Sequence, residues 1–340
     1  MQKKIIYLII GIVLCFLGLI IFIALYSAKP MTKLTNPLKD NIQFLTLLSD
    51  SQSAYYYDSN SSIKKWNLKT NKIEDWVKLP FSNVDGISYS PDTNMAIVYQ
   101  NDPLDSTIEY TWLINLTDKK IVKQLSQNIY FNTWSPDSKK NAFQYFNEQT
   151  NRIETGISNF DGTNLKKLVD LNSEVGIDLI WPNEQTLIYY DSPADATDTI
   201  INSLNLATNK SEIIPTQSNL IYGLFVTDKN KMIINFTNDD RTINEIKTYD
   251  LTTKETKTID KNNLFLDKMA QIPNTNNLIA AYRPINQQTD DIIKINTDTG
   301  KISTVRAKLP NKIDAINLMV SNDGKFVYFT SGSDFYKMKL

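Results

Sequence analysis

A repeat of about 45 residues runs through most of this chain and limits how the chain can fold. Each copy holds an apolar strand, a turn rich in Asp, Asn and Pro, and a second apolar strand, as in GISYSPDTNMAIVYQ (86–100). A weaker copy occupies residues 44–58. Successive turns are 45, 46, 45, 46 and 49 residues apart, at Pro91, Pro136, Pro182, Thr227, Pro273 and Asn322.

A second series of turns repeats with the same period at another place in each copy. These turns begin at Asn67, Asn115, Asn159, Asn205, Asp250 and Asn296. The segments between turns are rich in Val, Ile, Tyr, Phe and Thr and show no long helical periodicity, which indicates an all-β protein. A repeat of this length with four short strands is typical of a β-propeller blade, which buries enough apolar surface only when it packs against other blades. We therefore predict a seven-bladed β-propeller over residues 43–340, with six or eight blades as the alternatives.

The turn motifs resemble those of a known family of repeats. Ser90-Pro91-Asp92 and Ser135-Pro136-Asp137, each followed by Ala and an aromatic residue, resemble the SPDG signature of TolB-type, WD-like propellers. The third copy continues with Phe160-Asp161-Gly162, close to the end of that family's repeat. The resemblance covers about residues 44–340 and implies the fold rather than a function. The chain departs from TolB because only about 17 residues separate its N-terminal apolar run from the first repeat.

The last repeat supplies only three strands, near residues 315–320, 326–330 and 334–340. A fourth strand could come from residues 32–38, as an N-terminal clasp at the outer edge of the last blade. Pro37 is tolerated there because an edge strand has one row of unpaired N–H groups. The alternative is a last blade with three strands.

Residues 5–25 form an uncharged apolar run of 21 residues, long enough to cross the hydrocarbon core of a bilayer as a helix. Lys3 and Lys4 precede it, so the positive-inside rule places residues 1–4 in the cytoplasm. A cleaved signal peptide would have a shorter apolar region and a small-x-small cleavage site, where this chain has Tyr26-Ser27-Ala28. We predict an uncleaved single-pass anchor, a linker over residues 26–42 that could include the clasp, and an extracytoplasmic propeller, periplasmic or on the cell surface.

The amino-acid composition of the chain excludes several kinds of catalytic and metal-binding site. The chain has no histidine and a single cysteine, Cys15, which lies inside the apolar run. A Ser-His-Asp triad, a His-ligated metal and an intramolecular disulfide are therefore impossible. With 36 Lys and Arg against 37 Asp and Glu, the chain lacks the basic excess of a nucleic-acid-binding protein. We predict no catalytic residue and no enzymatic activity.

The candidate binding residues are aspartates in the loops between the second and third strands of the repeats. If these loops share one face, their carboxylates would attract cations or a basic partner. The simpler interpretation, which we favour, is that they are ordinary solvated loop residues. Calcium accepts such oxygen ligands, but no segment has the spacing of a calcium-binding loop, so we predict no metal or cofactor. The residues are Asp102, Asp105, Asp191, Asp195, Asp198, Asp239, Asp240, Asp290 and Asp291.

These features favour a membrane-anchored, extracytoplasmic propeller that binds a protein or glycan partner of the cell envelope or acts as a scaffold there. Two alternatives stay open. One is a glycan-acting enzyme that uses a pair of carboxylates, because Asp is plentiful. The other is a structural component of an envelope secretion or pilus complex. Trp134 and Trp181, beside two of the repeat turns, are expected to pack between blades rather than to bind a ligand.

Overall fold

The computed structural model describes most of the chain beyond residue 30. The described residues are 31–35, 41–58, 60–105, 109–125, 129–147, 149–150, 152–168, 177–191, 200–215, 220–227, 230–237, 244–259, 268–284, 287–310 and 313–340. Among them, no helix is long and apolar enough to cross a membrane. The predicted anchor, residues 5–25, lies outside the described residues and stays a prediction.

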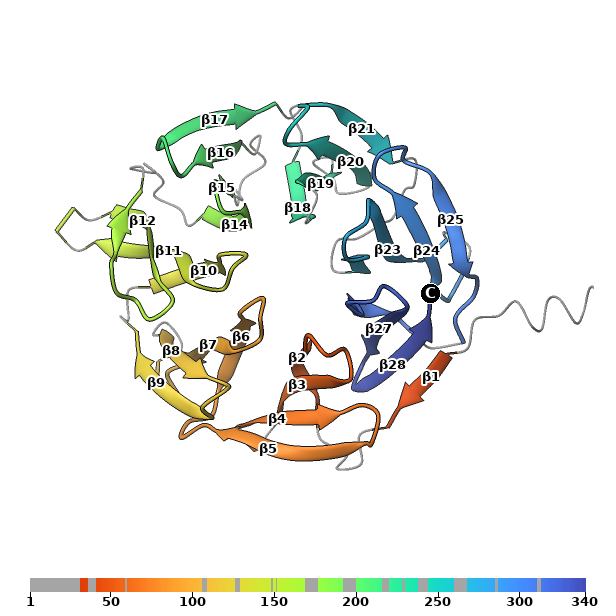
Figure 1. Ribbon diagram of the computed structural model, residues 1–340, viewed down its shortest axis with the longest axis horizontal. Coiled ribbons are helices and arrows are strands. Elements are labelled where there is room, and N and C mark those ends of the chain that lie inside the picture. The colour runs from red at the N-terminus through yellow and green to blue at the C-terminus, as the bar shows by residue number, and fades with distance from the viewer. Residues whose placement is uncertain are drawn as a thin grey trace, which may run out of the picture.

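Seven four-stranded antiparallel sheets, here called blades 1 to 7, surround a common axis (Figure 1). Blade 1 contains β2 (Gln43–Leu47), β3 (Ser53–Asp58), β4 (Ser62–Asn67) and β5 (Lys72–Lys78), and blade 2 contains β6 (Val84–Tyr89), β7 (Met95–Asn101), β8 (Glu109–Asn115) and β9 (Lys120–Gln124). Blade 3 contains β10 (Ile129–Trp134), β11 (Lys140–Asn147), β12 (Arg152–Asn159) and β13 (Lys166–Lys167), and blade 4 contains β14 (Ile177–Asn183), β15 (Thr186–Asp191), β16 (Ile201–Asn205) and β17 (Lys210–Ile214).

Blade 5 contains β18 (Leu220–Val226), β19 (Lys231–Thr237), β20 (Asn244–Asp250) and β21 (Thr256–Ile259), and blade 6 contains β22 (Met269–Gln271), β23 (Asn277–Tyr282), β24 (Asp291–Asn296) and β25 (Ile302–Arg306). Blade 7 contains β26 (Ile316–Val320), β27 (Phe326–Ser331), β28 (Asp334–Lys339) and β1 (Met31–Leu34). The all-β, seven-bladed prediction is confirmed. We call the face with the turns after the first and third strands of each blade the turn face, and the opposite face the loop face.

One backbone hydrogen bond recurs in all seven blades and aligns them residue by residue. The residue after the third strand donates its N–H to the carbonyl oxygen of the residue before the second strand, with N···O distances of 2.7–2.9 Å. The donor and acceptor pairs are Leu68–Gln52, Leu116–Asn94, Phe160–Lys139, Leu206–Gln185, Leu251–Asn230, Thr297–Asn276 and Leu340–Lys325.

The side chains of the turns explain why the repeat is visible in the sequence. Ser90 Oγ donates to Asp92 Oδ1 at 2.6 Å and accepts the N–H of Met95 at 3.0 Å, while Asp92 Oδ1 accepts the N–H of Asn94 at 3.1 Å. Such bonds let a short polar side chain replace the backbone partners that a tight turn leaves unpaired. The same bonds form at Ser135 with Asp137 and at Ser321 with Asp323.

The second series of turns uses one Asn or Asp side chain in the same way. Asn67 Oδ1 accepts the N–H groups of Lys69 and Thr70, at 3.0 and 2.8 Å. Asn205 Oδ1 accepts those of Ala207 and Thr208, both at 3.0 Å. Equivalent bonds form at Asn115, Asp250 and Asn296.

The fourth strand of blade 7 comes from the N-terminal side. β1 pairs antiparallel with β28, with Met31 opposite Met338 and Leu34 opposite Phe335, and lies beside it at the outer edge (Figure 1). The alternative of a three-stranded last blade is therefore wrong. The strand starts one residue earlier than the segment suggested by the sequence, and it ends before Pro37, which lies outside the described residues.

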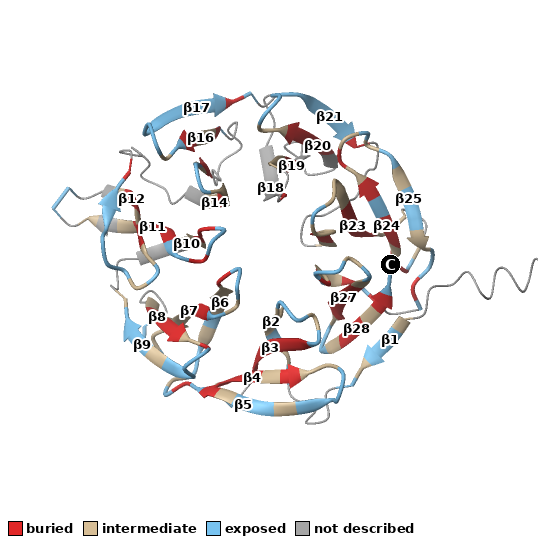
Figure 2. Cartoon of the chain, viewed as in Figure 1, coloured by how far each residue is buried: buried red, intermediate tan, exposed pale blue. Residues whose placement is uncertain are grey.

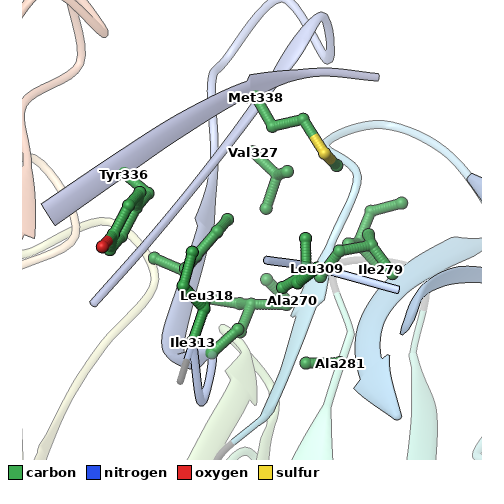
Figure 3. Close-up of a cluster of buried hydrophobic side chains, with 12 residues drawn as sticks. Ala270, Ile279, Ala281, Leu309, Ile313, Leu318, Val327, Tyr336 and Met338 are labelled. Carbon is green, nitrogen blue, oxygen red and sulfur yellow. The ribbon is translucent and has the colours of Figure 1, made fainter. Parts of the chain in front are cut away.

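The apolar cores lie between blades. Most buried residues lie in the second and third strands of the blades, such as β3 and β4, whereas β5, β9 and β17 are largely exposed (Figure 2). In the cluster between blades 6 and 7, Ile279 and Ala281 from β23 pack with Leu318, Val327 and Met338 from blade 7 (Figure 3). Each blade therefore needs its neighbours in order to bury both faces.

Trp134 shows this packing between blades 2 and 3. It is 6% exposed, packs with Met95, Ile97 and Leu113 of blade 2, and its indole N–H lies 3.2 Å from the carbonyl oxygen of Ser88. Trp181 is also buried and packs in the cluster between blades 3 and 4. The prediction that both rings belong to the core is confirmed.

We expect Trp134→Ala to lower the free energy of unfolding by roughly 3–5 kcal/mol, because it leaves a cavity between two blades. Urea titration followed by fluorescence or circular dichroism measures this change. The control is Leu165→Ala, because Leu165 is 54% exposed and its truncation should cost less than about 0.5 kcal/mol. If Trp134→Ala lowers the free energy of unfolding as little as Leu165→Ala does, the indole lies outside the core.

The clasp gives a second prediction. Met31 packs against the cluster between blades 6 and 7, and Leu34 against the cluster between blades 7 and 1. Fragment 31–340 should therefore unfold at a higher urea concentration than fragment 42–340, which leaves the edge of β28 unpaired. Far-ultraviolet circular dichroism should show both fragments as almost wholly β. Equal midpoints would mean that β1 does not hold the ring closed.

Candidate functional site

The structure describes some of the loop aspartates that the sequence offers as candidate binding residues. Asp102, Asp105, Asp290 and Asp291 are described, Asp191 is described in its backbone only, and Asp195, Asp198, Asp239 and Asp240 lie outside the described residues. The loops that carry Asp102 and Asp290 belong to blades 2 and 6, on opposite sides of the ring (Figure 1). These two carboxylates are therefore not brought together in one cluster.

Asp102 holds its own loop, and Asp291 holds the chain that follows β25. Asp102 Oδ1 accepts the N–H of Leu104 at 2.7 Å and that of Asp105 at 3.1 Å, and Oδ2 accepts the hydroxyl of Tyr110 at 2.9 Å. The bond from Leu104, followed by that from Tyr110, lowers the pKa of Asp102. Asp291 Oδ1 accepts the N–H of Lys308 at 2.7 Å. These contacts support the interpretation of Asp102 and Asp291 as structural loop residues.

Asp290 is fully buried and belongs to a network of four charges between blades 6 and 7. Its carboxylate lies 2.9 Å from Arg283 Nε and 3.3 Å from Lys268 Nζ, and it accepts the N–H of Ala315 at 2.9 Å. Both cations also bind Asp314, with Arg283 Nη2 at 2.7 Å. The bond from Lys268 is the main reason why the pKa of Asp314 lies below its usual range. The network joins two blades and pairs the carboxylate of Asp290 with two cations of the chain itself.

A better candidate is a groove of about 480 Å³ on the turn face, between blades 7 and 1, where the ring closes. Its walls are the β2–β3 turn (49–52), the β26–β27 turn (321–323) and the start of the β4–β5 turn (68–69). Phe326 and Tyr328 of β27 and Lys337 of β28 complete its lining. We call this site the closure groove.

Hydrogen bonds between the two blades preform the closure groove. Asn322 donates its N–H to Ser51 Oγ at 2.9 Å and its side-chain amide to the carbonyl oxygen of Ser49 at 2.7 Å. The hydroxyl of Tyr328 donates to the carbonyl oxygen of Ser51 at 3.0 Å. A ligand therefore meets ordered walls, which reduces the conformational entropy lost on binding.

A lysine lies over the aromatic side chains of the groove. Lys337 Nζ is 4.1 Å from the ring centre of Phe326 and 5.4 Å from that of Tyr328, within the range of cation–π attraction. Burial, with the charges of Asp323 and Asp50, raises the pKa of Tyr328 to about 12. The phenol is therefore neutral near pH 7 and serves as a hydrogen-bond donor.

The two carboxylates of the groove are used by their own turns. Asp50 accepts the N–H groups of Gln52 and Ser53, both at 2.8 Å, and the hydroxyl of Ser53 at 2.9 Å. Asp323 accepts the hydroxyl of Ser321 at 2.7 Å and the N–H of Lys325 at 3.1 Å, and these bonds hold its pKa at about 2.

The two lysines of the groove are not held by a carboxylate of the described chain. Among the described residues, no carboxylate forms an ion pair with Lys69 or Lys337. Lys69 is exposed at the edge of the groove and Lys337 is half-buried. An anionic group in the groove would therefore meet two ammonium groups whose charges no described carboxylate pairs.

Sequence analysis missed this site, although the repeats contain a signal for it. When the recurrent backbone bond aligns the blades, only blade 7 has an aromatic residue at the position of Phe326. The equivalent residues of blades 1 to 6 are Ser53, Met95, Lys140, Thr186, Lys231 and Asn277. Comparing each strand position across the repeats, rather than only the turns, would have shown this departure.

Seven four-stranded blades around one axis, closed by an N-terminal strand, define a seven-bladed β-propeller. The chain is similar to the WD40 repeats of RRP9, with 10% identity and a TM-score of 0.62 over 92% of this chain and 99% of the other. It is also similar to the β-propeller domain of Cps50 (Swd1) from Myceliophteria thermophila, with 11% identity and a TM-score of 0.61 over 92% of this chain and 100% of that domain.

A third similar structure is hydrazine synthase from Kuenenia stuttgartiensis, with 12% identity and a TM-score of 0.62 over 88% of this chain and 96% of the other. Likeness at such low identity shows the fold alone. No model of a protein family matches the sequence, and no curated protein is significantly similar to it. The β-propeller fold is therefore confirmed, while the WD-like and TolB-type assignment stays a prediction.

The charge network gives a test of the structural role of Asp290. We expect Asp290→Ala to lower the free energy of unfolding by roughly 3 kcal/mol. This is the lower end of the cost of breaking a buried ion pair, and we choose it because Arg283 and Asp314 are partly exposed. Urea titration measures it. The control, Asp102→Ala, changes an exposed loop and should cost less than about 1 kcal/mol. Unchanged stability in Asp290→Ala would contradict the structural role.

Proposed function

We propose that this chain is a single-pass membrane protein whose extracytoplasmic propeller binds a protein partner of the cell envelope, or acts as a scaffold there, through the closure groove. The observation that carries the proposal is the groove itself. It is preformed by bonds between the first and last blades, has an aromatic lining, and contains two lysines that no described carboxylate pairs with.

The size and composition of the groove support binding. About 480 Å³ lies within the usual range of ligand pockets, which combine apolar walls with a few polar groups that fix orientation. Leu68, Phe326 and Tyr328 supply the apolar part, and Lys69 and Lys337 supply charge. A groove of this kind accepts one or two side chains of a bound segment. A protein partner would add contacts with the neighbouring turns.

The chemistry of the groove does not fit a glycan-acting site there. Such an enzyme needs a general acid whose pKa is raised toward neutrality. In the groove, the pKa of Asp323 is instead held at about 2, and both oxygens of Asp50 accept hydrogen bonds from its own turn. Among the described residues, no group of three acidic side chains is placed to hold a metal ion.

Photo-crosslinking tests the proposal with a control that the repeat itself supplies. Ala207 occupies in blade 4 the turn position that Lys69 occupies in blade 1, and both are exposed. A photoreactive benzoylphenylalanine at position 69 of the full chain should give a discrete product with a partner in cells. Position 207 should not. The yield at position 69 should fall when Lys337→Glu reverses the charge in the groove.

Equal products from positions 69 and 207 would contradict binding at the groove. Purification in detergent then separates the remaining alternatives. A stoichiometric complex with secretion or pilus components that persists in Lys337→Glu would favour a structural role outside the groove. Release of sugars from a glycan panel by fragment 31–340 would establish the enzyme.

A further inference from the structure

The direction of β1 and the charges of the closure groove together indicate which partner reaches it. Building on the proposed function, we infer that the closure groove faces the membrane and binds an acidic segment that another membrane-anchored protein presents at the bilayer surface. The inference rests on three observations: the face on which β1 begins, the length of chain before β1, and the charges in the groove.

β1 begins on the turn face, beside the groove. Its first residue, Met31, lies opposite Met338, near the end of β28, because the two strands are antiparallel. The next residue after β28, Leu340, donates its N–H to Lys325 in the β26–β27 turn. That turn also supplies Asn322 and Asp323 to the groove. The chain therefore reaches the propeller on the face where the groove opens.

Little chain separates the apolar run from β1. Leu25 ends the run and Met31 begins the strand. Even a fully extended chain covers only about 20 Å over these six steps. With residues 5–25 in the bilayer, the start of β1 lies within about 20 Å of the edge of the hydrocarbon core. Roughly 5–7 Å of that distance is taken up by the headgroup layer. The turn-face end of blade 7 then lies next to the membrane. In the arrangement that we infer, the turn face looks toward the membrane and the loop face looks away.

Because Asp50 and Asp323 bond within their own turns, the two ammonium groups are the charges left for a ligand, which favours an acidic one. A neutral sugar or aromatic ring that stacked on Phe326 would have to displace the ammonium group of Lys337, which already lies over that ring. A carboxylate can instead approach Lys337 and Lys69 directly and form charge-assisted hydrogen bonds. Its neighbouring apolar side chain can contact Leu68 and Tyr328. A segment that alternates acidic and apolar residues fits both requirements.

A protein segment fits this face better than anionic lipid. Attraction to an anionic bilayer surface requires clustered basic residues. Here, aspartates lie among the lysines in the turns of the other blades on the same face. They are Asp92, Asp118, Asp137, Asp161, Asp250 and Asp298. The lysines of the groove are therefore a small basic site on a face of mixed charge. Such a site suits one acidic segment better than the surface of an anionic bilayer.

Energy transfer in the full chain tests the orientation. In a Cys15→Ser background, Ala207→Cys places a donor dye on the turn face, and Leu104→Cys places one on the loop face. The chain is inserted into phosphatidylcholine nanodiscs that contain acceptor-labelled lipid. A strand of six or seven residues spans about 20 Å, so transfer should be clearly stronger from position 207. Equal or stronger transfer from position 104 overturns the inference.

The ligand is tested in the same discs with a lipid-tethered peptide of alternating Glu and Leu. A carbodiimide, which couples a lysine amine to a carboxylate only at ion-pair distance, should join the peptide to Lys69 and Lys337. It should not join the peptide to Lys301, which lies on the turn face of blade 6. Lys337→Met keeps the aliphatic stem and should weaken binding roughly tenfold, a change that corresponds to about 1.4 kcal/mol. Lys301→Met should change nothing.

Two results separate this inference from the proposed function. If a peptide of alternating Gln and Leu binds as well as the Glu peptide, the acidic ligand is wrong, while crosslinking from position 69 still identifies the groove as a binding site. If phosphatidylserine in the disc displaces the Glu peptide, and Lys337→Met abolishes that displacement, a lipid headgroup occupies the groove and the inference is overturned.

Discussion

Every blade of this propeller depends on the packing of its two faces against neighbours. A four-stranded sheet has apolar side chains on both sides, and neither side is covered until another blade lies against it. Ile279 and Ala281 of blade 6, for example, are buried only because blade 7 covers them. A row of such sheets would always leave two end faces exposed. Closing the ring removes both ends, so the contact between blades 7 and 1 completes the fold.

That contact differs from the others in its side chains. Tyr56, Trp66, Tyr328 and Phe335 form its buried centre, with Trp66 and Tyr328 each 5.8 Å from Phe335 between ring centres. Aromatic rings bury much area per residue, which suits a joint between the two ends of a chain. Phe326, Tyr328 and Leu68 belong to or pack against this cluster, and they also line the closure groove. The groove is thus the outer margin of the joint on the turn face.

Local chemistry made the fold predictable from the sequence, and non-local contacts hid the site. The period was visible because side chains such as Asp92 and Asn67 bond backbone groups two or three residues away, which only certain residues can do. The groove depends on Ser51 and Asn322, which are far apart in sequence and meet only when the ring closes. Similarly, nothing in the sequence around Asp290 indicates that Arg283 and Lys268 neutralise it. A count of aspartates therefore marks the loops but does not show the bonds and ion pairs that the described residues form.

The way the ring closes also decides which face a membrane anchor meets. The first strand of each blade begins on the loop face, so a chain that started at β2 would have its N-terminal end on that face. β1 reverses this arrangement because it is a fourth strand, antiparallel to β28, and begins on the turn face. One short strand therefore closes the ring, covers the clusters on both sides of blade 7 through Met31 and Leu34, and sets the side on which the preceding residues lie. Closure by a C-terminal strand would bury similar surface but would turn the groove away from an N-terminal anchor.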